Sequence, residues 1–243
     1  MPTSTPAHSE SRGIAERTFT CAVADRTAPV TVWLPMSHGR CPLVLVGHGG
    51  SGHKRSEFVL DVVNQLVRER GFAVAAMDGP VHGDRRHSAG SPNAVREEFR
   101  SLWEAGGSVE PMVADWRAVL DALCAFREID PSRIGYYGLS MGTAYGLPLL
   151  ASEPRIRAAV IGMWGTSRVN SARLVDDARA VRCPTLFSLQ WNDELFTREG
   201  QFEVFDAIAA ERKSMSIYTG GHVNPGGARL DDIVHFLTRE LAA

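Results

Sequence analysis

RIGYYGLSMG, residues 133–142, carries the clearest structural signal in the sequence. Its first half contains a short apolar run, Ile134–Tyr137, of the kind that forms a strand buried on both faces. Its second half, Gly138–Gly142, matches the pattern G-x-S-x-G, and a helical segment, Gly142–Ala151, follows. A serine between a strand and a helix, with glycine two residues before and after it, predicts a strained turn. Such a turn presents the Ser140 hydroxyl above the sheet edge, at a helix N-terminus that favours developing negative charge.

Similar apolar runs alternate with helical segments along the rest of the chain. The runs are Leu43–Val46, Ala73–Met77, Ala158–Ile161, Thr185–Leu189 and Met215–Tyr218. The helical segments are Phe58–Arg70, Ser108–Phe126, Phe202–Arg212 and Asp231–Leu241. This alternation predicts a doubly wound α/β sheet with parallel strands. Pro148 is expected to kink or shorten the helix that follows Ser140.

The two ends of this pattern differ from the middle. Arg17–Val23 and Val30–Leu34 are β-like runs separated by a turn, and we expect an antiparallel hairpin there, which brings the predicted strands to eight. Residues 1–14 are polar and predict a flexible N-terminal tail, so residues 15–243 form the single domain. Asp78–Gly107 is about twice as long as a usual strand-to-helix connection, which favours a role in ligand contacts.

The composition excludes several classes of partner. Acidic and basic residues nearly cancel, with a formal net charge of −2, so we expect neither a nucleic acid nor an anionic membrane as partner. We find no signal-peptide pattern at the N-terminus and no apolar stretch that reaches the roughly 20 residues of a membrane span. The four cysteines are scattered and predict free thiols, which fits a reducing cytoplasm. The oligomeric state is not indicated.

Several further motifs occur in a fixed order over about residues 40–225. They are His48–Gly50, Asp78–Gly83, Asp130–Ile134, the G-x-S-x-G turn, Trp191–Phe196 and Gly220–His222. In these motifs the chain resembles the capless serine α/β-hydrolases, especially the dienelactone-hydrolase-like and prolyl-oligopeptidase-like esterases. The resemblance implies a mostly parallel eight-stranded sheet, helices on both faces and no large cap domain. Dienelactone hydrolase proper uses cysteine where Ser140 stands, and the family often has a second glycine where this chain has Thr143.

The resemblance implies a role for each of three residues. Ser140 is the expected nucleophile, His222 its general base, and Asp193 the acid that orients the imidazole, in the chain order serine, acid, histidine. Glu194 and Asp84 are the alternatives for the acid. The expected oxyanion hole consists of the N–H groups of Gly50 and Met141.

Other residues are expected near this site. Ser51 is the alternative oxyanion donor, and His48 is expected to brace its loop by hydrogen bonds. The candidates for the substrate pocket are Phe99, Trp103, Trp164, Trp191 and His82, the last from the stretch Asp78–Arg85 that shapes the site wall in the family. A metal site built from His82, Asp84 and His87 is an alternative use of that stretch, but its further ligands are not evident, and no metal is expected.

These expectations define a function. The chain is expected to hydrolyse a small-molecule carboxylic ester or a lactone through an acyl-enzyme intermediate, without a cofactor. A peptidase or amidase, and an acyltransferase or thioesterase, would use the same three residues. A catalytically silent binding protein on this fold is the alternative from another class.

Overall fold

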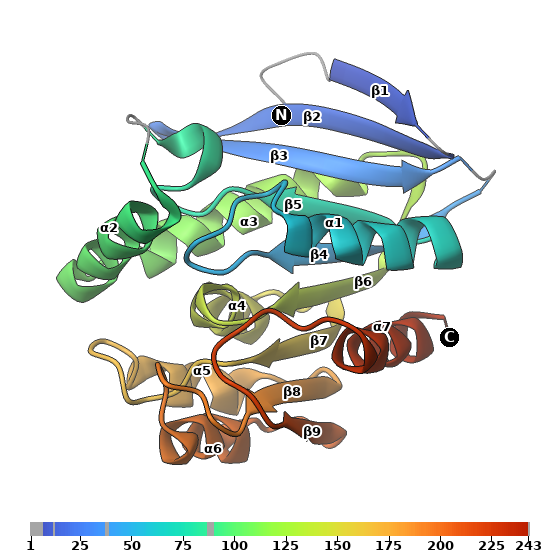
Figure 1. The fold of residues 1–243 in the computed structure, drawn as a ribbon. Helices are drawn as coiled ribbons and strands as arrows, with labels where there is room; N and C mark the ends of the chain where they lie inside the picture. Colours follow the sequence, from blue (N-terminus) through green and yellow to red (C-terminus); the bar gives the residue numbers. More distant parts are fainter. Residues whose placement is uncertain (1–6, 12, 37–38, 87–89, 243) are drawn as a thin grey trace.

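A nine-stranded sheet runs through the molecule in the order β1-β2-β3-β5-β4-β6-β7-β8-β9 (Figure 1). The computed structural model describes residues 7–11, 13–36, 39–86 and 90–242. The strands are β1 (Ala7–Ser11), β2 (Ile14–Val23), β3 (Arg26–Pro35), β4 (Cys41–Gly47), β5 (Ala73–Met77), β6 (Ile129–Gly138), β7 (Ile156–Gly162), β8 (Thr185–Gln190) and β9 (Lys213–Tyr218). All eight predicted strands are confirmed as β2 to β9.

The strand pairing divides the sheet into two parts. Strands β2 and β3 form the predicted antiparallel hairpin, and β3 pairs antiparallel with β5. From β5 to β9 all neighbouring strands are parallel. The carboxyl ends of these parallel strands therefore meet at one edge of the sheet, the left edge in Figure 1.

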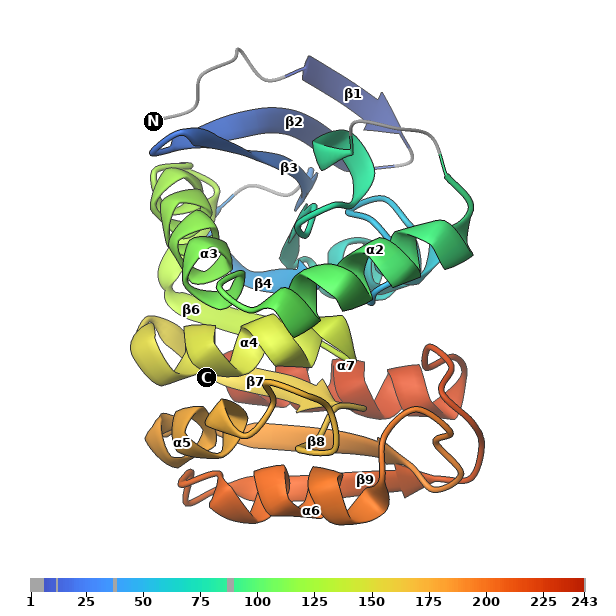
Figure 2. The ribbon, with the colours of Figure 1, turned by 90° about the vertical axis from the view of Figure 1, so that its left-hand side faces the viewer.

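Helices cover both faces of the sheet. They are α1 (Glu57–Val63), which continues as a π-helical turn over Asn64–Arg68, α2 (Pro92–Ala105), α3 (Val109–Cys124), α4 (Met141–Ser152), α5 (Arg173–Ala180), α6 (Arg198–Ala207) and α7 (Ala228–Leu241). In Figure 2, α3 and α5 lie on one side of the sheet and α7 lies on the other. Helix α2 crosses the carboxyl edge of the strands in the same view, so it lies above the site that the sequence predicts.

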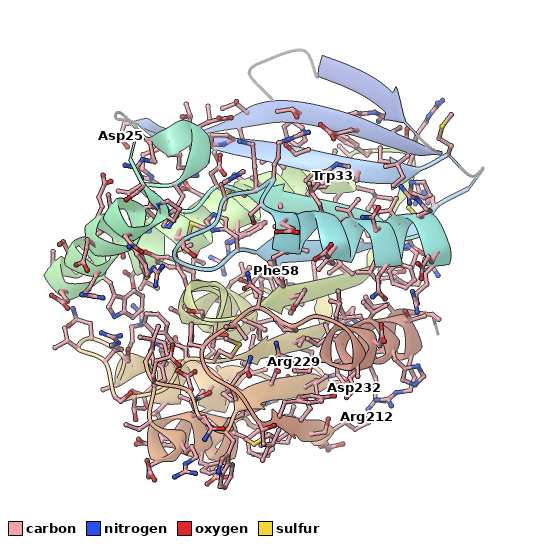
Figure 3. The ribbon with its side chains drawn as sticks, viewed as in Figure 1. Asp25, Trp33, Phe58, Arg212, Arg229 and Asp232 are labelled. Carbon is pink, nitrogen blue, oxygen red and sulfur yellow. The ribbon has the colours of Figure 1, made fainter. Side chains whose placement is uncertain are left out.

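Consecutive tyrosines on β6 pack into the two hydrophobic cores, one on each face of the sheet. Because side chains alternate along a strand, Tyr136 and Tyr137 point to opposite faces. Tyr136 packs edge-on against Trp116 of α3, with ring centroids 6.1 Å apart. Tyr137 packs against Phe58 of α1 at 5.3 Å, in the core that also contains Trp33; Figure 3 labels Phe58 and Trp33 on that face. The central strands are thus apolar throughout because helices bury both of their faces.

The structure corrects four local expectations. Ala7–Ser11, predicted to belong to a flexible tail, form β1 and pair antiparallel with β2. Helix α5 was not predicted, and α6 begins and ends about four residues earlier than expected. Helix α4 extends through Pro148 to Ser152, so it is not shortened there. Within the described ranges, none of the helices combines the length and the apolarity that a membrane crossing requires.

Candidate active site

The turn at Ser140 is strained and tightly packed. Ser140 has φ 57° and ψ −122°, a backbone conformation that L-residues rarely adopt. A Cβ atom on Gly142 would lie 2.5 Å from the Gly47 carbonyl oxygen, and one on Gly138 would lie 2.9 Å from the Gly142 carbonyl oxygen. Both glycines of the motif are therefore required by the close approach of β4, β6 and α4.

Thr143, which replaces the family's second glycine, ties the turn to the next strand. Its hydroxyl oxygen accepts the N–H of Gly162, at 2.7 Å, and lies 2.6 Å from the Gly162 carbonyl oxygen and 2.9 Å from that of Gly138. The N–H of Ser140 also donates to the Gly162 carbonyl, at 3.0 Å. The departure from the family pattern thus adds hydrogen bonds that hold the strained turn.

The structure brings Ser140, His222 and Asp193 into one hydrogen-bonded chain. The Asp193 carboxylate, whose side chain is fully buried, lies 2.9 Å from His222 Nδ1, and His222 Nε2 lies 2.9 Å from Ser140 Oγ. A carboxylate only accepts hydrogen bonds, so Nδ1 carries the proton and Nε2 is free to accept the one from Ser140. The N–H groups of Leu195 and Phe196 donate to the other Asp193 oxygen, at 2.8 and 3.0 Å, and fix the carboxylate.

The alternative acids lie elsewhere. Glu194 does not contact the imidazole ring of His222; its carboxylate accepts the backbone N–H of that residue at 2.8 Å, and this bond lowers the pKa of Glu194. The Asp84 carboxylate instead binds Lys54 Nζ at 2.6 Å. Of the three carboxylates considered, Asp193 has the geometry that orients the ring.

Gly50, Ser51 and Met141 are the residues whose backbone N–H groups are the expected oxyanion donors. In the part of the chain that the structure describes, none of these three N–H groups donates a hydrogen bond. Gly50 and Ser51 line the same cavity as Ser140, and Met141 is the first residue of α4. The arrangement can therefore stabilise negative charge that develops on an oxygen bound next to Ser140.

His48 braces this loop, as the sequence indicated. Its Nε2 accepts the N–H of Gly79 at 2.9 Å, so the ring proton is on Nδ1, which donates to the Gly49 carbonyl at 2.8 Å. The ring is almost fully buried, and burial lowers the pKa of His48 to about 3. His48 is therefore neutral and structural at neutral pH.

A buried ion pair under the loop was not predicted. Lys54 Nζ lies 2.5 Å from an Asp78 carboxylate oxygen, and the two residues are 4% and 0% exposed. The backbone N–H groups of Lys54 and Asp84 also donate to Asp78. Burial raises the pKa of the Asp78 carboxyl, but the hydrogen bond from the Lys54 ammonium and those from the two backbone N–H groups together hold it below the usual value. Lys54 follows His48 by six residues. This spacing is the one sequence signal that could have placed Lys54 near the loop that begins at His48.

A cavity of about 360 Å³ opens above Ser140. Four aromatic side chains form its apolar wall, and three of them were predicted; they are Phe99, Trp103, Trp164 and Phe196. Trp103 Nε1 donates to the Val169 carbonyl at 2.8 Å, and Trp164 Nε1 donates to Ser171 Oγ at 3.0 Å. These bonds fix the orientation of both indole rings. The charged residues of the lining are Arg96, Arg100, Glu104, Arg168 and His222, the last of these only when protonated.

Two predicted pocket residues do not reach this cavity. Trp191 is 44% exposed and packs under the guanidinium of Arg198, 4.3 Å from its ring centroid, because the chain turns outward where β8 ends. His82 is fully buried beneath the loop of Gly50. As for the alternative metal site, His87 lies outside the described residues and Asp84 is paired with Lys54; among the described residues, we find no cluster of three or more metal-ligating side chains.

Several lining residues were missed by sequence reasoning. Leu195 and Phe196 lie two and three residues after Asp193, and Arg168 and Val169 lie in the connection that follows β7. Their common signal is position after the carboxyl end of a parallel strand, where α/β sheets place ligand contacts.

The fold and this site define the class of protein: the chain is an α/β-hydrolase. The family model for the dienelactone hydrolase family matches residues 29–221, and the chain belongs to that family. It is 34% identical to a cold-adapted esterase from an Arctic intertidal metagenomic library, with a TM-score of 0.85 over 96% of this chain and 97% of that one.

More distant comparisons agree on the fold. Acetyl xylan esterase 1 from Thermoanaerobacterium sp. JW/SL YS485 superposes with a TM-score of 0.73 at 16% identity, over 98% of this chain and 88% of that one. The 2,6-dihydropseudooxynicotine hydrolase of Paenarthrobacter nicotinovorans is 31% identical over 56% of this chain. The chain spans 31% of the length of that relative and 53% of a second curated one, the quorum-quenching protein AidA of Acinetobacter baumannii.

The buried His48 should make the fold sensitive to acid. Its pKa is about 3 in the folded protein, against an ordinary value of 6.5, so between these values the unfolded chain binds a proton that the folded chain does not. Stability contributed by the neutral ring is therefore complete above pH 6.5 and falls by about 1.4 kcal/mol per pH unit below it. Urea unfolding at pH 7 and pH 5 should show a loss about 2 kcal/mol larger in the wild type than in His48→Gln. Equal losses of unfolding free energy in the two proteins would contradict the lowered pKa of His48.

Proposed function

We propose that the protein is a serine esterase that cleaves carboxylic esters or lactones with Ser140, His222 and Asp193. The observation that carries the proposal is the pair of 2.9 Å contacts joining Asp193, His222 and Ser140 at the floor of an accessible cavity. The family relationship and the 34% identical esterase support hydrolysis as the reaction.

The acylation step follows from the proton positions. Ser140 Oγ attacks the ester carbonyl carbon while its proton passes to His222 Nε2, and the carbonyl oxygen takes up the negative charge. The N–H groups of Gly50 and Met141 bind that oxygen, with Ser51 beside them. Asp193 stabilises the imidazolium, which then returns its proton to the leaving alcohol as the C–O bond breaks.

Deacylation uses the same groups in reverse. Water gives a proton to His222 Nε2 and attacks the acyl carbon, the oxyanion forms again, and the acid leaves as Ser140 recovers its proton. Apart from the substrate and this water molecule, every group in the two steps comes from the chain.

The cavity favours substrates of small or medium size. Its aromatic wall suits an apolar acyl or alcohol group, and about 360 Å³ accommodates a compact ester.

The state of the cysteines bears on the compartment. The four cysteines are all unpaired, which supports a reducing cytoplasm as the compartment.

Ser140→Ala should abolish ester hydrolysis without unfolding the protein. Removing the nucleophile of a comparable serine enzyme costs on the order of 10⁶ in turnover. The measurement is release of p-nitrophenol from p-nitrophenyl acetate, with circular dichroism to check folding. A fluorophosphonate probe should label the wild type at Ser140 and leave the variant unlabelled. A folded variant that kept a tenth of the wild-type rate would exclude Ser140 as nucleophile.

Asp193→Asn should damage turnover far more than Glu194→Gln. An amide at 193 cannot hold the required imidazole tautomer, and the equivalent change costs about 10⁴ in a related triad. An amide at 194 can still accept the His222 N–H, so we expect less than a tenfold loss there. Steady-state kcat of the two variants is the test, and the reverse order would make Glu194 the acid.

Trp103→Ala should change which esters are accepted. The indole forms part of the cavity wall, so its removal should raise kcat/KM for a long acyl ester relative to a short one by about tenfold, since apolar contacts in such pockets are worth about 1–3 kcal/mol. Phe99→Ala should act in the same direction. Trp191→Ala is the matched control, because that tryptophan lies outside the cavity. If the ratio of kcat/KM for the long and the short ester were unchanged in both Trp103→Ala and Phe99→Ala, the segment Asp78–Gly107 would have a purely structural role.

A further inference from the structure

The oxyanion loop, defined here as Gly47–Gly52, is bound along its length to the segment Asp78–Asp84. Gly79 donates to His48 near the start of the loop, and Lys54 binds Asp78 and Asp84 just beyond its end. Between these two attachments, one side chain from the segment reaches the middle of the loop. It belongs to His82.

His82 is held with both ring nitrogens against carbonyl oxygens. Its Nε2 lies 3.0 Å from the Gly50 carbonyl oxygen and its Nδ1 lies 2.5 Å from that of Pro80. The ring packs against His48, with centroids 4.9 Å apart, and against Phe99 at 5.9 Å. It is fully buried and does not line the cavity, so it cannot contact a substrate there.

The two histidines act on consecutive peptide groups. In a trans peptide, the C=O and the following N–H point in opposite directions. The bond from His48 to the Gly49 carbonyl therefore sets the direction of the Gly50 N–H, and the contact of His82 with the Gly50 carbonyl sets that of the Ser51 N–H.

The Gly49 and Gly50 carbonyl groups differ in the number of hydrogen bonds that hold them. The Gly49 carbonyl also accepts the N–H of Gly52, at 2.9 Å. Within the described ranges, the Gly50 carbonyl has His82 as its one hydrogen-bond partner. The orientation of the Gly50–Ser51 peptide therefore depends on His82.

We propose that His82 is a positioning residue that donates from Nε2 to the Gly50 carbonyl and so directs the Ser51 N–H into the cavity as an oxyanion donor. The proposal rests on the proposed acyl transfer at Ser140. Because His82 is buried and does not line the cavity while Gly50 and Ser51 do, an N–H that points away from His82 is directed to the cavity side of the loop, the side that Ser140 also lines. The transition-state oxygen then receives the Ser51 N–H in addition to those of Gly50 and Met141.

The proton count leaves two assignments for the His82 proton, which substitution can separate. Burial lowers the pKa of His82, so the ring is neutral and carries one proton. It can donate to Gly50 or to Pro80 but not to both. The amide nitrogen of glutamine corresponds to Nε2 of histidine and that of asparagine to Nδ1, so two substitutions separate the two contacts.

The experiment compares His82→Gln with His82→Asn in the full chain. Hydrolysis of p-nitrophenyl acetate should show kcat within about threefold of wild type for His82→Gln. For His82→Asn, kcat should fall about 10- to 100-fold with KM unchanged within twofold, a smaller loss than the roughly 10²- to 10³-fold cost of removing a donor outright. Affinity for a phenylboronic acid, which mimics the tetrahedral state, should fall with kcat/KM. Equal kcat in the two variants, or a loss confined to KM, would overturn the proposal.

A second pair of variants tests the donor itself. Ser51→Pro removes the N–H and should lose about 100-fold in kcat and in boronic acid affinity, whereas Ser51→Ala keeps the N–H and should lose at least about tenfold less than Ser51→Pro in both measurements. This pair decides the question if His82→Asn does not fold, as measured by thermal unfolding. His235→Asn, on the exposed face of α7, is the control for a histidine substitution.

The wild type is assayed first, so that two failures are kept apart. Absence of both hydrolysis and fluorophosphonate labelling at Ser140 would reject the proposed function. Normal hydrolysis and labelling, together with wild-type kcat in His82→Asn and Ser51→Pro, would reject the role of His82 and Ser51 alone.

Discussion

The strained turn at Ser140 is held between three closely approaching backbones. A positive φ at a serine costs about 1–3 kcal/mol, and such a conformation persists only where its surroundings fix it. Here β4 and α4 approach so closely that Gly142 has no room for a side chain, and the Gly162 carbonyl on β7 accepts the Ser140 N–H. The positions of the neighbouring strands thus determine where the hydroxyl points.

The loops around this turn are held from below by groups that substrate does not touch. Burying the charges of Lys54 and Asp78 is unfavourable unless each finds a partner, and here the ammonium meets two carboxylates while Asp78 also accepts two backbone N–H groups. The result is a rigid support under Gly50 and Ser51. Under the proposed mechanism, N–H donors supported in this way need no rearrangement when charge develops on the substrate oxygen.

The sequence predicted those parts whose signal is local. Buried strands appear as apolar runs, and the Ser140 turn appears as a motif between a strand and a helix. Helix α5 was missed because only Leu174 and Ala178 of its eight residues are buried, which is too few for a clear periodicity. Trp164 and Trp191 both follow strands, yet one lines the cavity and the other faces solvent; the direction of a side chain after a strand depends on the loop that follows. The partner of Lys54, Asp78, lies 24 residues away along the chain, and no local sequence pattern indicates that pairing.

The attachment of α2 to the connection after β7 affects which substitutions the mouth of the cavity can tolerate. Trp103 Nε1 donates to the Val169 carbonyl, and the Asn170 side chain donates to the carbonyls of Trp103 and Glu104. Since carbonyl groups are present whatever the side chain, residue 169 and residue 104 can mutate without removing an acceptor. Selection can therefore reshape the mouth of the cavity at such positions while the two segments keep their spacing, so new substrate preferences can evolve on an unchanged frame.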